Sequence, residues 1–314
     1  MRLLLIVFIM SLMTTISYAR DQIKIVGSST VYPFSTVVAE RFGKSGKFKT
    51  PVIESTGTGG GMKLFCAGIG VNTPDMSNAS RKIKPKEVKL CKDNGVTEIT
   101  QVIVGLDGIA FTSSVKGKSY NFTKEHLWQA MSDLGSKPTK WSDIDPSLPD
   151  YKIAILTPPA TSGTRDAWNS LVMKKGCPEE ILKEQGKKAC YMLREDGAVI
   201  EVGENDTLII NKLVGEPTYF GIFGFSYYDN SKDKVQAHLI EDKKISLKSI
   251  QDGSYPISRP LYFYVKDQHI GVIPGVEEYV KEFTSKRAAG PRGYLLDLGL
   301  VPLKSLKESI SKVE

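Results

Sequence analysis

The sequence is poor in the residues that most enzymes and metal sites use. Its 314 residues include only three histidines, His126, His238 and His269. A nucleophilic serine needs a base such as histidine beside it, and the serine-hydrolase motif G-x-S-x-G is absent. No cluster of aspartate and glutamate indicates glycosidase chemistry. The composition therefore does not favour an enzyme.

Two nucleotide-binding fingerprints are also missing. In the glycine-rich turn STGTGGGMKLF, residues 55–65, Lys63 is preceded by Met62 and followed by Leu64. The turn therefore does not match G-x-x-x-x-G-K-[ST]. Counted from Gly57, the last glycine of G-x-G-x-x-G would fall on Met62. A nucleotide is not favoured, which leaves a bare anion or no ligand at all.

Long apolar runs are absent except at the start of the chain. The first residues, MRLLLIVFIMSLMTTISYA, contain Arg2, an apolar run over residues 3–13, and small residues at Ser17 and Ala19. This pattern predicts a cleaved secretory signal over residues 1–19. The alternative, a membrane anchor, is less favoured because the run is too short to span a bilayer comfortably. No cysteine lies at the cleavage point, so we expect no lipid anchor.

Only four cysteines are present, Cys66, Cys91, Cys177 and Cys190. In an exported protein an even number of cysteines suggests disulfides. Nearest-neighbour pairing would join Cys66 to Cys91 and Cys177 to Cys190, although four cysteines allow three connectivities. A zinc site is the alternative. It is not favoured, because no C-x-x-C occurs and the histidines lie far away in sequence.

The chain carries a formal charge of +7. A basic exported protein suits an anionic ligand or surface, although lysines can also serve solubility alone. The lysines are spread along the chain without an aromatic-interleaved basic stripe, so a nucleic-acid partner is not favoured.

Strand-like and helix-like segments alternate along the chain. Short apolar runs at residues 23–26, 51–54 and 152–156 each lead through a Ser/Thr/Gly turn into a segment with helical periodicity. This alternation predicts α/β layers with mainly parallel sheets, and the length predicts about two domains. Further strands are expected at residues 102–104, 109–112, 219–225 and 261–265, and a C-terminal helix at 276–286.

The three turns share one composition: GSSTVYP (27–33), STGTGGG (55–61) and TSGTRD (161–166). The first turn of a helix has unpaired N–H groups and partial positive charge, and Ser and Thr add hydroxyl donors. One such junction can hold an anion, and three suggest a tetrahedral oxyanion contacted from several sides. The alternative is ordinary helix capping.

Arginine is the expected cationic partner of such an anion, because its guanidinium donates to two oxygens at once. Arg81 and Arg165 are the candidates, and Asp166 could hold the Arg165 side chain in place. The alternative is that both arginines are solvated surface residues.

Taken together, these segments resemble the periplasmic phosphate-binding proteins of high-affinity phosphate ABC transporters. GSSTVYPFSTVVAERF, STGTGGGMKLFCAG, DMSNASRKI and SGTRDAW carry the resemblance, and YFGIFGFSYY and YPISRPLYFYV extend it over nearly the whole mature chain. The resemblance implies an α/β type II periplasmic-binding-protein fold, in which two lobes joined by a two-strand hinge close over phosphate. Residues 20–107 with 257–314 would form one lobe and 108–256 the other, with crossings near 107–110 and 255–260.

The resemblance also implies phosphate contacts at the three turns and the two arginines. These residues are Ser29, Thr30, Val31, Thr58, Ser80, Arg81, Ser162, Gly163, Thr164 and Arg165. Where the best-known branch of the family has an aspartate that accepts a phosphate proton, this chain has Ser80. Where that branch has an arginine before S-G-T, this chain has Pro158, and Arg165 follows instead. The chain thus resembles a variant branch with NASR and SGTR motifs.

We therefore expect a periplasmic receptor that captures inorganic phosphate and passes it to an inner-membrane ABC permease. It would act as a monomer, without cofactor, metal or nucleic acid, and would do no chemistry on its ligand. One alternative is a receptor for another oxyanion, such as sulfate, molybdate or a phosphonate. The others are a secreted phosphatase on a similar scaffold and a surface adhesin that uses the basic face.

Overall fold

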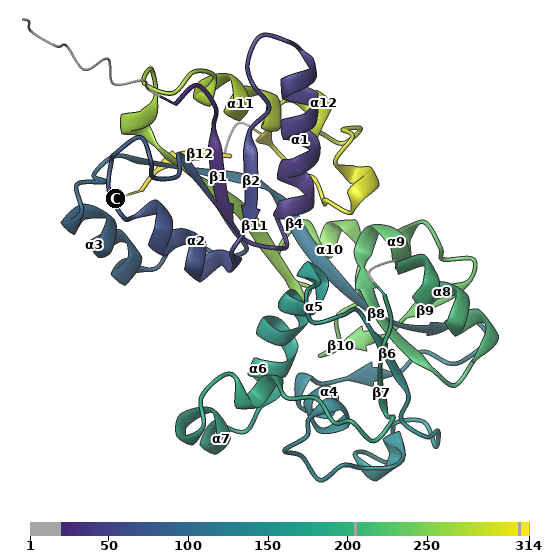
Figure 1. The fold of residues 1–314 in the computed structure, drawn as a ribbon. Helices are drawn as coiled ribbons and strands as arrows, with labels where there is room; N and C mark the ends of the chain where they lie inside the picture. The colour runs from purple at the N-terminus through teal and green to yellow at the C-terminus, as the bar shows by residue number, and fades with distance from the viewer. Residues whose placement is uncertain (1–19, 204–205, 307–308, 314) are drawn as a thin grey trace, which may run out of the picture.

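The structure, a computed structural model, describes residues 20–203, 206–306 and 309–313. The predicted secretory signal, residues 1–19, lies outside them. Two groups of helices surround a mixed sheet, and two long strands, β4 and β11, run from one group to the other (Figure 1).

The first lobe is built around three parallel strands, with β1 between β2 and β3. Each of these strands leads into a helix, as the alternation predicts. On the first helix, Phe34, Val38 and Phe42 recur at helical spacing and are buried. The elements are β1 (Lys24–Gly27), α1 (Tyr32–Lys44), β2 (Val52–Ser55), α2 (Gly57–Phe65), β3 (Met76–Ala79) and α3 (Pro85–Asp93).

The strand β4, Ile99–Ser114, is longer than the sequence predicts. Its first part pairs antiparallel with β11, Ser258–Lys266, and its last part with β8, Phe220–Gly224. We expected two separate runs, 102–104 and 109–112, because Gly105 and Gly108 lie between them. These glycines serve packing instead, since an added Cβ would lie 2.7 Å from Leu300 and 2.4 Å from Ile250, respectively. The strand therefore continues through both lobes.

The second lobe continues the sheet in the order β4-β8-β6-β7, with β6 parallel to β7 and β8. The helix expected after β6 is interrupted by a π-type turn, Asn169–Met173. The expected strand 219–225 ends at Gly224, where a helix begins. Elements of this lobe are α4 (Lys124–Met131), β5 (Asn121–Phe122), β6 (Ile155–Thr157), α5 (Gly163–Trp168), α6 (Lys174–Gly176), α7 (Glu179–Glu184), β7 (Val199–Glu201), α8 (Asp206–Gly215), α9 (Phe225–Asp229), β9 (Val235–Ala237), β10 (Leu239–Ile240) and α10 (Leu247–Gln251).

The chain then returns to the first lobe. The expected helix 276–286 is two helices, because Ser285 caps a second one by accepting a hydrogen bond from the Ala288 amide. These elements are α11 (Val276–Phe283), α12 (Lys286–Ala289) and β12 (Ile310–Lys312), of which β12 pairs with β4.

Each lobe has its own apolar core. One core draws on residues 23–104 and 261–300, and the other on residues 109–257 and Val301. The predicted two-lobe α/β architecture joined by two strands is confirmed, although the sheet is mixed because β4, β11, β9 and β12 pair antiparallel.

Both nearest-neighbour disulfides are confirmed. Cys66 at the end of α2 is bonded to Cys91 of α3, with Cα atoms 4.2 Å apart. Cys177 is bonded to Cys190, with Cα atoms 5.6 Å apart. Within the described ranges, no helix combines the length and apolarity needed to cross a bilayer.

Candidate anion-binding cleft

A cleft of about 670 Å³ lies between the two lobes. The start of α2 and the segment after β3 line it from the first lobe, and α5 with the following π turn, α6 and the loop before Tyr191 line it from the second. The first residues of β11 complete it. Residues of all three predicted turns therefore line this cleft, the first through Ser28 and Ser29 and the third through Asp166 alone.

The first turn, between β1 and α1, presents donors to the cleft. Ser28 and Ser29 line it. The Ser28 hydroxyl is buried and has no hydrogen-bond partner among the described residues. Val31, the N-cap residue of α1, supplies no side-chain cap; the Tyr32 amide donates instead to the Ser28 carbonyl at 3.0 Å, and Pro33 has no N–H. Ordinary capping does not account for this turn.

The second turn, at the start of α2, places Thr58 against Ser80. The Thr58 hydroxyl accepts a hydrogen bond from the Ser80 amide at 3.1 Å, and the two hydroxyl oxygens lie 3.2 Å apart. Thr56, the N-cap residue, makes no cap hydrogen bond. Gly61 allows α2 to approach β1, because an added Cβ would lie 2.4 Å from the Gly27 Cα. The glycines thus position a pair of hydroxyls at the cleft.

The third turn lies differently from the prediction. Ser162 caps its own helix by accepting a hydrogen bond from the Thr164 amide at 3.2 Å. The Gly163 carbonyl accepts a hydrogen bond from the Thr30 hydroxyl at 3.2 Å, which joins the two lobes. Ser162, Gly163 and Thr164 are not among the residues that line the cleft, whereas Asp166 of α5 is.

Arg81 lines the cleft, but its charge already has a partner. Its guanidinium donates to both carboxylate oxygens of Glu87, at 2.7 and 2.8 Å. Burial opposes ionisation of Glu87, yet hydrogen bonds from Arg81 and the Lys84 amide hold its pKa below the ordinary value. The geometry therefore ties Arg81 to the start of α3.

Arg165 points away from the cleft. It donates to the Pro158 carbonyl at 3.1 Å and lies 3.8 Å from Glu201. Burial lowers its pKa, and Glu201 partly opposes that shift. The expected contact with Asp166 is wrong, because consecutive helical residues project about 100° apart. Asp166 lies instead 3.4 Å from Arg259.

Arg259, at the start of β11, was missed by sequence reasoning. Its side chain lines the cleft and is 10% exposed. It donates to the Thr30 hydroxyl at 3.0 Å and to the Ser170 hydroxyl at 3.2 Å, and lies 3.6 Å from Asp107. One clue was available in the sequence, since Arg259 immediately precedes the apolar run 260–265.

Asp107 of β4 lies beside this arginine. Burial raises the pKa of its carboxyl, Arg259 opposes the shift, and Asp166 adds to it. One carboxyl oxygen, Oδ2, has no hydrogen-bond partner among the described residues.

The mouth of the cleft is strongly basic. Lys82 and Lys84 line it from the first lobe, and Lys174 and Lys187 from the second, whereas Asp166 is the one carboxylate among the described residues that line it. The pKa of Lys84 is lowered, chiefly by Arg81 and then by burial, with a smaller contribution from Lys187 across the cleft. Excess positive charge with hydroxyl and amide donors suits an anion.

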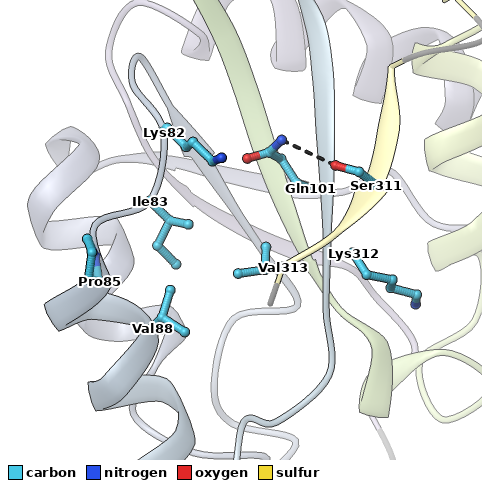
Figure 2. A pocket seen from close by; sticks show the side chains of 8 residues that line it. All are labelled: Lys82, Ile83, Pro85, Val88, Gln101, Ser311, Lys312 and Val313. Carbon is cyan, nitrogen blue, oxygen red and sulfur yellow. Dashed lines mark hydrogen bonds between the residues drawn. The ribbon is translucent and has the colours of Figure 1, made fainter.

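A second hollow of about 540 Å³ lies beside the cleft, between α3 and β12. Figure 2 shows Lys82, Gln101 and Ser311 at one end of it and apolar side chains at the other. The Gln101 amide donates to Ser311, and Lys312 is held by Asp267. Its polar groups are largely paired with each other, so it is the weaker anion site. In the described part of the chain, no group of three or more His, Cys, Asp or Glu side chains could hold a metal ion.

Comparison with known proteins gives one consistent family. The model of a PBP superfamily domain matches residues 14–287. Protein SphX of Synechococcus elongatus is 30% identical over 249 residues, which cover 77% of this chain and 67% of that protein. The phosphate-binding protein PstS of Staphylococcus saprophyticus is 29% identical over 301 residues, covering 93% and 84%. A crystal structure described as a possible phosphate binding protein from Planctomyces limnophilus superposes with a TM-score of 0.75 at 26% identity, covering 91% and 95%.

Proposed function

The chain belongs to the periplasmic-binding-protein (PBP) superfamily, and from that premise we propose that it is an extracytoplasmic receptor for inorganic phosphate. It binds phosphate in the interlobe cleft and delivers it to an ABC permease. The names of the relatives support the ligand, and the strand order β2-β1-β3-β11-β4, with the returning strand inserted before β4, fits a type II fold.

One observation carries the proposal. The start of α2, which has no side-chain cap, and the turn that leads into α1 meet at a single basic cleft, with the hydroxyls of Ser28, Ser29, Thr58 and Ser80. Helix N-termini and hydroxyls are donors that can replace the hydration of a small oxyanion.

The proposed contacts are those expected from the resemblance. Ser29, Thr58, Ser80 and Arg81 already line the cleft. The other expected residues can contact phosphate only if the two lobes move relative to each other, because the hydroxyl of Thr30 already donates to the Gly163 carbonyl in the third turn. These residues are Thr30, Val31, Ser162, Gly163, Thr164 and Arg165.

Further properties belong to the same proposal. Residues 20–107 with 257–314 form one lobe and 108–256 the other, which the division of the two apolar cores supports. The signal over residues 1–19 is removed, and the mature protein is periplasmic, monomeric and without a lipid anchor. It does no chemistry on phosphate, and its NASR and SGTR motifs place it in a variant branch of the family.

Calorimetric titration of the mature chain with phosphate, sulfate and arsenate tests this proposal. We expect sulfate to bind more weakly than phosphate, because a cleft hydroxyl such as that of Ser80 can accept the proton that phosphate carries and sulfate lacks. Equal affinity for sulfate would favour a general oxyanion receptor. Turnover of a chromogenic phosphate ester would show a phosphatase.

A matched pair of variants locates the site. Thr58→Val removes a hydroxyl that lines the cleft, and we expect phosphate affinity to fall roughly tenfold. Thr36→Val removes a hydroxyl that bonds only the Tyr32 carbonyl of its own helix, and should leave affinity unchanged. Equal effects of the two changes would contradict the placement.

A further inference from the structure

Arg259 contacts both lobes at once. On the first lobe its guanidinium donates to Thr30, and on the second lobe it donates to Ser170 and lies 3.4 Å from Asp166. Its backbone belongs to β11, one of the two strands that cross between the lobes. No other arginine that lines the cleft has partners on both lobes.

The charge of Arg259 is incompletely matched. Its Nε is buried without a hydrogen-bond partner among the described residues, and the nearest Asp107 oxygen lies 3.6 Å away. That distance exceeds a normal hydrogen bond. Asp166 is 55% exposed, so water screens much of its attraction. Arg81 differs, because Glu87 accepts two short hydrogen bonds from it. Although two carboxylates lie near it, Arg259 therefore keeps hydrogen-bonding capacity for an additional anion in the cleft.

Building on the proposed function, we propose that Arg259 is the principal cation for the bound oxyanion, and that Asp166 is the counter-ion that the anion displaces. Asp107, with Oδ2 3.6 Å from the Nε of Arg259, acts as a positioning residue. A tetrahedral oxyanion can accept two hydrogen bonds from a guanidinium, whereas Asp166 accepts a single long one, at 3.4 Å.

This assignment also connects binding to lobe movement. The hydroxyls of Thr30 and Ser170 both accept hydrogen bonds from Arg259, one from each lobe. A shift of the guanidinium from Asp166 toward an anion therefore changes contacts on both lobes together. The cation that binds the ligand thus lies on β11, which runs between the lobes, and the hydroxyl groups that bind it lie on the lobes themselves.

Three substitutions test the proposal on the mature chain by calorimetry. Arg259→Gln should weaken phosphate binding roughly 100-fold, because a charged hydrogen-bonding partner is lost. Arg259→Lys keeps the charge without the two-pronged geometry and should lose roughly tenfold. Asp166→Asn should strengthen phosphate and sulfate binding alike, each by roughly threefold, because it removes a competing carboxylate. Weaker phosphate binding in the Arg259 variants together with tighter binding in Asp166→Asn would show that the anion replaces Asp166 as the partner of Arg259.

Arg292→Gln is the matched control, since Arg292 is exposed and does not line the cleft. Urea unfolding of each ligand-free variant separates lost binding from lost folding. The Lys and Gln variants of Arg259 both lose the arginine hydrogen bonds to Thr30 and Ser170. A role for Arg259 as the cation of the bound anion therefore predicts that the Lys variant binds phosphate more tightly than the Gln variant. A steeper salt dependence for the wild type than for Arg259→Gln is expected for the same reason.

The outcomes are distinct. Phosphate affinity within twofold of the wild type in both Arg259 variants would overturn the assignment while leaving phosphate reception intact. If Asp166→Asn weakens phosphate but not sulfate, the carboxylate accepts a ligand proton and is not a displaced counter-ion. If the wild type binds sulfate but not phosphate, the proposed function fails, and the same panel titrated with sulfate still tests Arg259.

Discussion

The two ends of β11 carry two buried groups of charged side chains that differ in how fully they are paired. Arg259 near its start belongs to the cleft, whereas Lys266 is its last residue and belongs to a cluster around Asp75. Both groups are largely removed from water. What separates them is how many buried polar atoms lack a hydrogen-bond partner: among the described residues, the Asp75 cluster has one such atom, Arg20 Nε.

The cluster around Asp75 is close to saturated. Its carboxylate is fully buried and accepts hydrogen bonds from Arg20 at 2.7 and 2.8 Å and from the Lys24 amide at 2.7 Å. His269 Nδ1 lies 2.6 Å from the same carboxylate. The ammonium of Lys266 donates to the Gly68 carbonyl and the Thr73 hydroxyl, both at 2.6 Å. Such a carboxylate has no capacity left for a ligand.

At the cleft, by contrast, three buried polar atoms lack hydrogen-bond partners among the described residues: Ser28 Oγ, Asp107 Oδ2 and Arg259 Nε. Leaving such groups unpaired is costly. The comparison teaches that a saturated buried cluster stabilises the fold, whereas an unsaturated one beside a cleft indicates where a ligand binds.

We expect the largest loss of stability from a substitution in the cluster around Asp75. Asp75→Asn leaves the cations of Arg20 and Lys266 without their carboxylate, and should lower the free energy of unfolding by about 3–5 kcal/mol. Urea denaturation measures this loss, and phosphate affinity should stay within about twofold. Asp93→Asn is the control, because it breaks an exposed pair with Lys89 and should cost less than about 1 kcal/mol. A binding defect in a folded Asp75→Asn protein would contradict the division.

A somewhat smaller effect concerns Lys266 and pH. Burial lowers its pKa from 10.5 to about 8, although Asp75 opposes the shift. Since the unfolded chain keeps the ordinary value, this lysine destabilises the fold below pH 8, and that cost is lost between pH 8 and 10.5. Relative to Lys266→Met, the wild type should gain about 3 kcal/mol over this range. Unfolding free energies that stay parallel across pH in the two proteins would show that Lys266 titrates normally.

The smallest effect tests the mouth of the cleft. Lys84→Gln and Lys187→Gln should each slow phosphate association roughly twofold at low salt, because both lysines attract the anion before it binds. Stopped-flow fluorescence measures the rates, and the difference should vanish at about 1 M salt. The neighbours Lys86 and Lys188 do not line the cleft, so Lys86→Gln and Lys188→Gln are matched controls. Equal slowing in all four would mean that net charge alone matters.

The sequence predicted much of the fold because its elements are local. The strand–turn–helix units at residues 23–44 and 51–65 depend on apolar spacing and on turn residues, which are visible in the chain. The two disulfides followed nearest-neighbour order. The continuity of β4 was not predictable, since Gly105 makes room for Leu300, a contact between residues far apart in sequence.

The site was predictable only in part, for a similar reason. Thr58 and Ser80 meet because they follow the carboxyl ends of β2 and β3, parallel strands that lie on either side of β1. Glu87, the partner of Arg81, is only six residues away in the sequence. The local sequence nevertheless does not show whether the Arg81 guanidinium binds Glu87 or an anion. Arg259 lies 229 residues from Thr30, so their contact depends on the return of β11 between β3 and β4.

The pairing of β4 also determines the order in which the chain can fold. Its residues bond to β8, β9, β11 and β12, and the last of these ends at residue 312. The first lobe therefore cannot complete its sheet until β11 and β12 have been synthesised, whereas the strands that the second lobe adds to this sheet are complete at residue 237. Contacts of such high sequence separation form slowly. The first lobe of this receptor is therefore completed late, by the last described strand of the chain.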